Sequence, residues 1–233
     1  MKGGEEMHIP DGWVDPFFLM ITWIVTIIII MASIRKMKDI DETRLTYMAV
    51  LAGTIFAAQM LNFPILGGTS GHLLGGALAA SIVGLWGGCL VISVVLIIQA
   101  FLFADGGIIA LGANIFNMAI VGVFVAYLIL RFFMINKTPK NRYRYYGGVF
   151  LGSFLSVIIA SVFAAIEIGI PVINSVSQVN FADSFLIILF YHLLIGIGEG
   201  IITLIIVSYF NTIQMNIFFE INNPSTTHNF SKR

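Results

Sequence analysis

The stretch Val14–Ile34, VDPFFLMITWIVTIIIIMASI, decides the fold class of this chain. From Pro16 to Ile34 it contains no charged residue. About 20 predominantly apolar residues are enough for one helix to cross the hydrocarbon core of a bilayer. The residues before this run are acidic and no small-residue cleavage site follows it. We therefore interpret it as a retained transmembrane helix rather than a signal peptide.

Composition extends this interpretation to the whole chain. Hydrophobic residues make up 58% of the 233 residues, charged residues make up only 10%, and the mean hydropathy is +0.97. Soluble domains are far less apolar. We predict an all-α, polytopic membrane helical bundle surrounded by the lipid bilayer. The formal net charge is zero, which gives no reason to expect nucleic acid as a partner.

The apolar runs predict about seven transmembrane helices. The third and fourth runs are short, and Trp86, Gly87 and Gly88 between them indicate a tight helical hairpin shielded by neighbouring helices. Counting those two runs as one helix would give six spans. The predicted spans are Val14–Ile34, Leu45–Phe63, His72–Leu85, Gly88–Phe103, Ala113–Phe133, Tyr146–Gly169 and Asp183–Phe210.

Lysine and arginine are unevenly distributed along the chain. They gather after the first span, after the fifth span and in the C-terminal tail, and cytoplasmic loops carry such an excess. We predict a multi-pass protein of the plasma (inner) membrane with its N-terminus outside and its C-terminus in the cytoplasm. The basic residues in these three places are Arg35, Lys36, Lys38, Arg44, Arg131, Lys137, Lys140, Arg142, Arg144, Lys232 and Arg233.

Three polar motifs then fall on the outer side. They are Met7-His8-Ile9-Pro10-Asp11-Gly12, Gly67-Gly68-Thr69-Ser70-Gly71-His72 and Ala104-Asp105-Gly106-Gly107, the last of which leads into Asn114. A histidine second from a free N-terminus can offer the α-amine, its own amide nitrogen and its imidazole Nδ1 to one metal ion. A fourth nitrogen from His72 would complete a square plane, which suits Ni(II) or Cu(II) and can admit low-spin Co(II).

Other polar residues of these motifs are expected to support the site. We expect Asp11 or Asp105 to hydrogen-bond a ligating imidazole, and Asn114 and Ser70 to support the surrounding loops. Taken singly, His72 is more often explained by hydrogen bonds to nearby backbone, whereas the two histidines together favour a metal. The ten methionines form no paired stripe on the outer loops, which disfavours copper transport.

These motifs, together with His192-Leu-Leu-Ile-Gly-Ile-Gly-Glu199-Gly, resemble the CbiM/NikM family. That family is the substrate-binding membrane component of cobalt and nickel energy-coupling-factor (ECF) transporters. The resemblance covers most of the chain from Met7 onward. It implies that Met7, His8 and His72 capture Co(II) or Ni(II) as the transported ligand, with no prosthetic group. The same nitrogen ligands suit both metals, so the preference between cobalt and nickel stays open.

The resemblance also implies partners: a transmembrane coupling (T) subunit, cytoplasmic ABC ATPase subunits and a small extra membrane subunit. The chain has no G-x-x-x-x-G-K-[ST] motif, so we predict a transport component that is not an enzyme, with ATP hydrolysis on separate subunits. Ala49, Gly53 and Ala57 form a small-residue stripe that suits either internal packing or a partner helix. His192 and Glu199, two helical turns apart, suit either a gating role or a buried polar network.

Two other functional classes fit parts of the sequence. A rhomboid-like intramembrane serine protease would use Ser70 of Gly68-Thr69-Ser70-Gly71 with His192 as its base, but it leaves the first polar motif unexplained. A secondary metal-ion transporter would need an ion-coupling route, for which Glu167, His192 and Glu199 make a poor relay. The sequence favours the importer subunit over both.

The first six residues bear on the chelate. With Met1-Lys-Gly-Gly-Glu-Glu attached, the Met7 nitrogen is an amide rather than a primary amine. Gly3-Gly4-Glu5-Glu6 can be encoded by a purine-rich stretch that resembles a ribosome-binding site ahead of the Met7 codon. We expect residues 1–6 to be a non-native or untranslated extension, residues 7–212 a single integral membrane metal-binding domain, and residues 213–233 a cytoplasmic polar tail.

Overall fold

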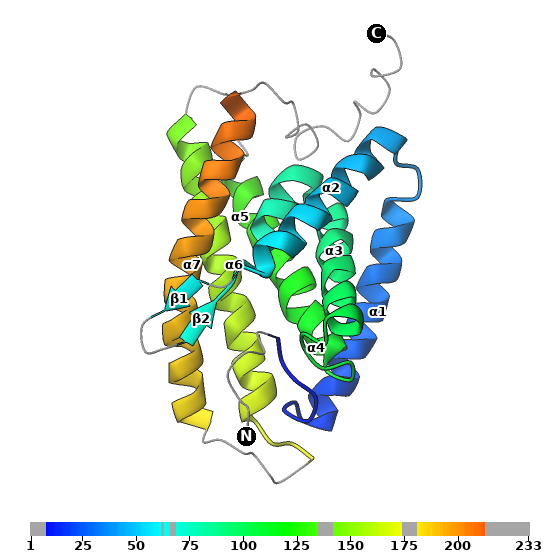
Figure 1. The fold of residues 1–233 in the computed structure, drawn as a ribbon, viewed down its shortest axis with the longest axis vertical. Helices are drawn as coiled ribbons and strands as arrows, with labels where there is room; N and C mark the ends of the chain where they lie inside the picture. Colours follow the sequence, from blue (N-terminus) through cyan, green and yellow to red (C-terminus); the bar gives the residue numbers. More distant parts are fainter. Residues whose placement is uncertain (1–7, 62, 66–68, 135–141, 174–180, 213–233) are drawn as a thin grey trace.

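A computed structural model describes residues 8–61, 63–65, 69–134, 142–173 and 181–212. Its long helices lie side by side (Figure 1), which confirms the all-α class. Met7 lies outside the described residues. The elements are α1 (Pro16–Lys36), α2 (Glu42–Gln59), β1 (Phe63–Ile65), β2 (Thr69–Gly71), α3 (Gly76–Leu102), α4 (Leu111–Asn114), the π-helix η1 (Ile115–Gly122), α5 (Val123–Met134), α6 (Arg142–Gly169) and α7 (Phe181–Thr212).

Five helical stretches of the described residues are long and apolar enough to cross a membrane, so the predicted count of about seven is not confirmed. The predicted span Leu45–Phe63 corresponds to α2, which is not one of the five. α2 ends at Gln59, and the short antiparallel hairpin β1–β2 follows it where the sequence had suggested continued helix. The five stretches are Pro16–Lys36, Gly76–Leu102, Leu111–Met134, Tyr143–Gly169 and Phe185–Phe210.

The third and fourth predicted runs belong to one element, α3, which bends sharply at Gly84. Gly84 has φ 75° and ψ −172°, a conformation that L side chains rarely adopt. A Cβ added to Gly88 would lie only 3.3 Å from the backbone nitrogen of Ala80. Residues eight apart in a straight helix are separated by about 12 Å. The chain therefore folds back on itself, at Gly84 rather than at the predicted Trp86–Gly88.

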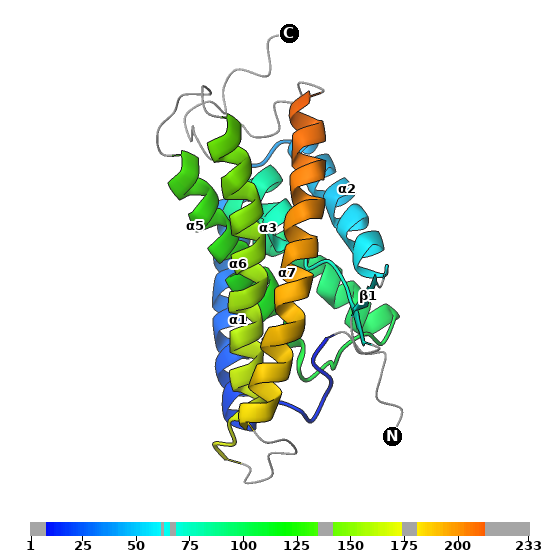
Figure 2. The same cartoon turned by 90° about the vertical axis from the view of Figure 1, so that its left-hand side faces the viewer.

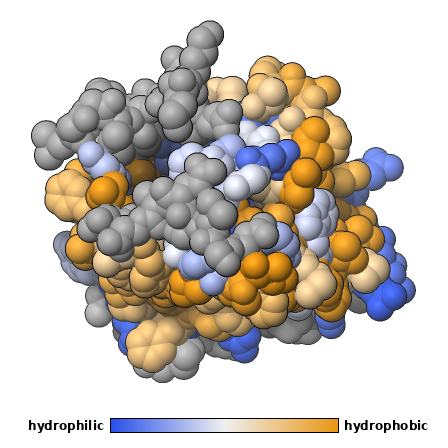
Figure 3. Space-filling model, turned by 90° about the horizontal axis from the view of Figure 1, so that it is seen from below, coloured by the Kyte–Doolittle hydropathy of each residue, from blue (hydrophilic) through white to orange (hydrophobic). Residues whose placement is uncertain are grey.

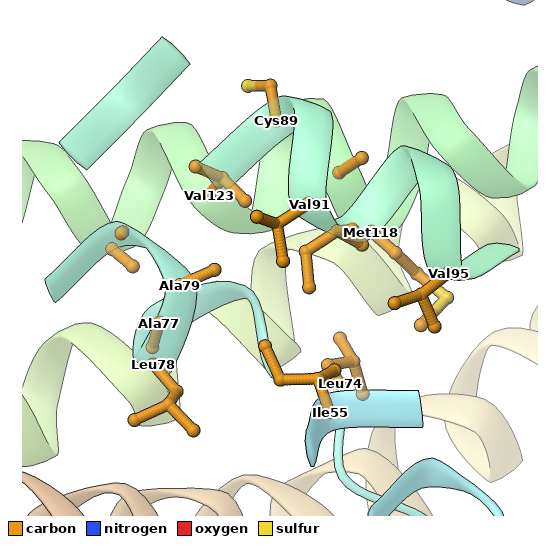
Figure 4. Packing of buried hydrophobic residues seen from close by; sticks show 14 of the residues in the cluster. Ile55, Leu74, Ala77, Leu78, Ala79, Cys89, Val91, Val95, Met118 and Val123 are labelled. Atoms are coloured by element: carbon orange, nitrogen blue, oxygen red, sulfur yellow. The ribbon is translucent and has the colours of Figure 1, made fainter. Parts of the chain in front are cut away.

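The buried core lies where the two arms of α3 meet α2 and α5. Figure 4 shows Ala77–Ala79 and Cys89–Val95 on separate helical segments, with Ile55 of α2 and Val123 of α5 nearby. Ile55 and Val123 are both fully buried. Gly88 fits because a Cβ there would come within 2.9 Å of the Val123 side chain. This close packing holds α3 in place, and α3 begins at Gly76, four residues after His72.

The outward faces of the helices are apolar. On α1, the side chains of Ile24, Ile28 and Met31 are about half exposed, at 51%, 54% and 45%. The polar side chains Thr22, Thr26 and Ser33 of the same helix are buried instead. A water-soluble protein would place these two groups the other way round. The reversed arrangement fits a multi-pass protein whose outer surface contacts lipid.

The polar motifs and the basic connections lie at opposite ends of the bundle. The start of α1, the start of α7 and the residues before Pro16 lie at the lower end in both side views (Figures 1 and 2). Arg35 and Lys36 end α1 at the upper end. Seen from below, polar residues lie among apolar ones at the lower end (Figure 3). This polarity agrees with the predicted topology, while the orientation in the membrane stays a prediction.

Candidate metal centre

The segment before α1 is fixed to the loop between α3 and α4 through Ile9. The backbone N–H of Ile9 donates to Asn114 Oδ1 at 2.9 Å, and Asn114 Nδ2 donates back to the Ile9 carbonyl at 3.1 Å. The Gly107 N–H also donates to that carbonyl, at 3.0 Å. Asn114 and Gly107 thus hold Ile9 from both sides, and the residue next to Ile9 is held in a defined position.

That residue is His8, whose imidazole is buried although it begins the described chain. Only 4% of His8 is exposed. Its Nδ1 lies 3.1 Å from Asp105 Oδ1 in an ion-pair contact, and neither ring nitrogen has a hydrogen-bond partner among the described residues. Buried polar atoms are nearly always hydrogen-bonded in native proteins. The Asp105 contact accounts for Nδ1, and a buried Nε2 with no partner among the described residues indicates a ligand site.

His72 lies directly against His8. The ring centroids are 5.2 Å apart and the planes are tilted by 55°. His72 is also buried, and its Nδ1 lies 2.8 Å from the Leu73 carbonyl. A carbonyl can only accept, so Nδ1 carries the proton and the lone pair of the neutral ring is on Nε2. This tautomer is the one in which Nε2 can bind a metal.

Two glycines of the third motif, Gly106 and Gly107, leave space for residues of the first motif, Met7–Gly12. Gly106 has φ +89°, and a Cβ there would come within 2.7 Å of the His8 Cβ. A Cβ on Gly107 would overlap with Asp11. Any larger residue at either position would push the N-terminal segment away from the loop. Sequence reasoning had identified the motif but not this steric requirement.

Asp11 was one of two carboxylates expected to hydrogen-bond a ligating imidazole. Among the described residues it has a different partner. Its Oδ1 accepts from the backbone N–H of Ala110 at 2.9 Å, and Asp105 is the carboxylate next to His8. Asp15, which sequence reasoning missed, joins a further loop to this end of the bundle. It caps α1 through the N–H of Phe17 and accepts from Val172 and Ile173 at 3.1 and 3.0 Å.

His192 and Glu199 lie two helical turns apart on α7, but their side chains have different hydrogen-bond partners. His192 Nδ1 bonds to the Ile188 carbonyl of its own helix at 2.7 Å. The Glu199 carboxylate instead accepts from the backbone of Leu74 and Gly75, just after His72. No contact joins His192 to Glu199 within the described part of the chain. Of the two, only Glu199 reaches the site.

The remaining predicted residues lie away from the imidazoles or outside what is described. Ser70 is on strand β2, and its side chain lies outside the described ones. Ala49, Gly53 and Ala57 are all exposed on α2, and a Cβ added to Gly53 would meet nothing within 4 Å. The stripe therefore does not serve packing within the described chain. Its use by a partner helix stays a prediction.

The described residues contain no group of three or more His, Cys, Asp or Glu side chains that could hold a metal. A metal between His8 and His72 therefore needs other ligands. The predicted ligands include backbone nitrogens of Met7 and His8, and these are not side chains of His, Cys, Asp or Glu. The two imidazoles fit this set, since each supplies one of its four nitrogens.

Comparison with known proteins agrees with the motifs. The sequence matches the CbiM family, described as the cobalt uptake substrate-specific transmembrane region, over residues 8–217. It is 41% identical over 207 residues to a putative fused nickel transport protein, NikMN, of Archaeoglobus fulgidus. That alignment covers 87% of this chain, which spans 65% of the relative's length.

A cobalt transport protein, CbiM, of Acetoanaerobium sticklandii is 32% identical over 207 residues, with 87% of this chain and 83% of the relative covered. The fold is also similar to that of a truncated transition metal transporter solved by crystallography. The TM-score is 0.78 at 31% identity, and 89% of this chain and 99% of the other are covered. With its family match over residues 8–217, this chain belongs to the CbiM family.

Proposed function

We propose that this chain is the metal-specificity subunit of an ATP-driven ECF-type importer and captures Co(II) or Ni(II) at the outer face of the cell. The observation that carries the proposal is the pair of buried imidazoles of His8 and His72, 5.2 Å apart. His8 Nδ1 has the Asp105 carboxylate as its ion-pair contact, and His8 Nε2 has no hydrogen-bond partner among the described residues. The names of relatives that are nickel and cobalt transport proteins support the choice of metal.

The distance between the rings suits two neighbouring ligands of one metal. Metal–nitrogen bonds of about 2 Å place the centres of two cis imidazoles roughly 4 to 5 Å apart. The observed 5.2 Å needs only a small approach of the rings. The Met7 amine, the His8 amide and His8 Nδ1 supply three nitrogens, and His72 Nε2 supplies the fourth. Four nitrogens in a plane suit Ni(II) and admit low-spin Co(II).

The chain before α1, which carries His8, lies in the half of the bundle away from the basic end of α1 at Arg35 and Lys36. The positive-inside rule places this half toward the outside of the plasma membrane, with the C-terminus in the cytoplasm. A metal entering from outside therefore meets the site before it meets the membrane interior. This arrangement supports capture for uptake rather than export.

The chain supplies binding, and its partners supply energy. A coupling (T) subunit, ABC ATPase subunits and a small extra membrane subunit would complete the importer. The outward-facing Ala49, Gly53 and Ala57 give the coupling subunit a surface on which two helices can approach closely.

Metal binding to two variants tests the proposal. His72→Ala should abolish high-affinity Ni(II) binding measured by calorimetry, because it removes one of four nitrogens. His192→Ala is the matched control, since its imidazole bonds within α7 and takes no part in the site. Unchanged Ni(II) affinity in His72→Ala, or equal loss in both variants, would remove His72 from the metal site.

The two alternatives gain no support. In the protease, His192 would have to act as a base on Ser70, whose side chain lies outside the described ones, and the first polar motif would stay unexplained. Labelling of Ser70 by a fluorophosphonate probe would reinstate that alternative. In the secondary transporter, Glu167 bonds to Asn117 at 2.7 Å and Glu199 bonds to the loop after His72. No contact links these groups into a relay among the described residues.

A further inference from the structure

We propose that Glu199 is a positioning residue for the metal ligand His72 and acts through the backbone N–H groups of Leu74 and Gly75. The inference rests on the proposed function, because it concerns the same site. Glu199 comes from α7, far away in the sequence, and never touches the imidazole itself in the described contacts. It would set where His72 lies and leave the ligation to the ring.

The geometry joins one carboxylate to two consecutive peptide groups. Glu199 Oε2 accepts from the Leu74 N–H at 2.6 Å, and Oε1 accepts from the Gly75 N–H at 2.9 Å. Glu199 is 1% exposed, so water does not compete for these bonds. Successive N–H groups around a residue with positive φ form a concave anion site, and Gly75 has φ +77°. Hydrogen bonds to a carboxylate are stronger than neutral ones.

The loop needs such an acceptor because α3 begins there without a cap of its own. Gly75 is the N-cap of α3 and has no side chain to accept a hydrogen bond. The N-terminal N–H groups of a helix have no partner within that helix. Glu199 therefore supplies, from a different helix, an acceptor for the N–H of the N-cap Gly75, the bond that a glutamate or glutamine in the first turn makes in a capping box, and a second acceptor for Leu74.

The same two residues are held on their other side by α2. Gln59 Nε2 donates to the Leu74 carbonyl at 2.7 Å, and Gln99 Nε2 donates to Gln59 Oε1 at 2.9 Å. A Cβ on Gly75 would come within 2.6 Å of Ile55. Leu74 and Gly75 are thus fixed between α2 and α7. His72 lies only two residues before Leu74, so a shift of Leu74 moves the imidazole.

Packing of α7 alone does not explain why this residue is a carboxylate. Burying an ionisable group inside a membrane bundle is costly, and a leucine or methionine would fill the same volume without that cost. What the carboxylate adds is two acceptor oxygens, and both are directed at the loop after His72. We therefore assign its role to that loop rather than to packing of α7.

Glu167 provides a matched control. It is also a buried glutamate, 3% exposed, but it accepts from the Asn117 side chain and not from the loop after His72. Glu199→Gln keeps the size of the side chain and turns one oxygen into an NH₂ group that faces a peptide N–H. Glu167→Gln makes the same chemical change elsewhere in the bundle.

Calorimetric titration of the full chain with Ni(II) tests the inference. Loss of a group that orients a metal ligand typically costs about 10- to 100-fold in metal affinity. We expect Glu199→Gln to lose that much and Glu167→Gln to stay within about threefold of the parent. The visible absorption band of bound Ni(II) should shift in Glu199→Gln, because a displaced His72 gives a weaker fourth nitrogen, and should not shift in Glu167→Gln.

A double-mutant cycle with His72→Ala separates positioning from a general effect. If Glu199 acts through His72, Glu199→Gln should not weaken the residual Ni(II) binding of His72→Ala any further. An additional loss in that background, or equal behaviour of the two glutamine variants, would overturn the inference. If Glu199→Gln does not fold, Glu199→Asp is measured in its place, and parent-like affinity there would also overturn it.

The outcomes distinguish this inference from the proposed function. If the parent protein fails to bind Ni(II), or if His72→Ala binds as the parent does, the proposed function fails. If the parent binds and His72→Ala does not, while Glu199→Gln binds as the parent does, only the positioning role fails.

Discussion

Nδ1 of His8 lies 3.1 Å from Oδ1 of Asp105, so a carboxylate stands next to the proposed metal ligand. In the amine-anchored chelate, Nδ1 must give its lone pair to the metal. A nitrogen that binds a metal cannot also donate a proton to a carboxylate. Metal capture therefore requires His8 Nδ1 to give up its contact with Asp105 and to bind the metal instead. The Asp105 carboxylate then favours the cation by its charge alone.

Asp105→Asn should lower the affinity for Ni(II) by about 10- to 100-fold, because the neutral amide does not attract the cation as a carboxylate does. Asp11→Asn is the comparison, since the Asp11 carboxylate bonds to Ala110 rather than to His8. Calorimetry on both variants checks this. A larger loss in Asp11→Asn than in Asp105→Asn would show that the wrong carboxylate has been assigned.

Gly106→Ala should weaken metal binding by more than tenfold because its Cβ would displace His8. Gly12→Ala is a close control: Gly12 has φ +87° and Gly106 has φ +89°, but a Cβ on Gly12 meets nothing within 4 Å. Both variants should lose about 1–2 kcal/mol of unfolding free energy from the positive φ. Only Gly106→Ala should also lose Ni(II) affinity. Equal affinities in the two variants would refute the steric role of Gly106.

The orientation of the bundle can be measured with introduced cysteines. Ile108→Cys, in the exposed loop after α3, should react with an impermeant thiol reagent added to intact cells. Asp39→Cys, in the connection after α1, should react only after the cells are opened. The native Cys89 is 1% exposed and should contribute little background. The opposite labelling pattern would contradict uptake from outside.

Gly53→Leu should leave metal binding intact and reduce metal uptake by the complete transporter. A Cβ at this exposed position meets nothing within 4 Å among the described residues, so the substitution should not disturb the fold. It would prevent close approach of a partner helix to the stripe of Ala49, Gly53 and Ala57. Val50→Leu, also exposed on α2, is the control. Uptake of radioactive Ni(II) at parent level in Gly53→Leu would exclude the stripe as the coupling surface.

The sequence was sufficient for the all-α class, because long apolar runs report directly on helices that can span a membrane. It also predicted a reversal near Gly88, but its position depends on the backbone angles of Gly84. Hydropathy alone could not show that α2 ends at Gln59 before a short hairpin.

Side-chain partners were harder to predict than the motifs themselves. The motifs brought His8, His72 and Asp105 to one end, yet only tertiary packing shows that Asp11 bonds to Ala110. The partner of Glu199 is a peptide backbone, which leaves no signature in residue identity. Spacing had grouped Glu199 with His192 on one helix face, whereas the contacts separate them.

The Ni(II) affinity of two forms of the protein tests the central claim most directly. One form begins at Met7 with a free amine, verified by intact mass, and the other is the full 233-residue chain. The amine-anchored chelate predicts tight one-to-one binding by the first form and much weaker binding by the second, since an internal peptide nitrogen cannot anchor the deprotonated amide. Equally tight binding by both forms would contradict it and would leave His8 and His72 in a looser site with other ligands.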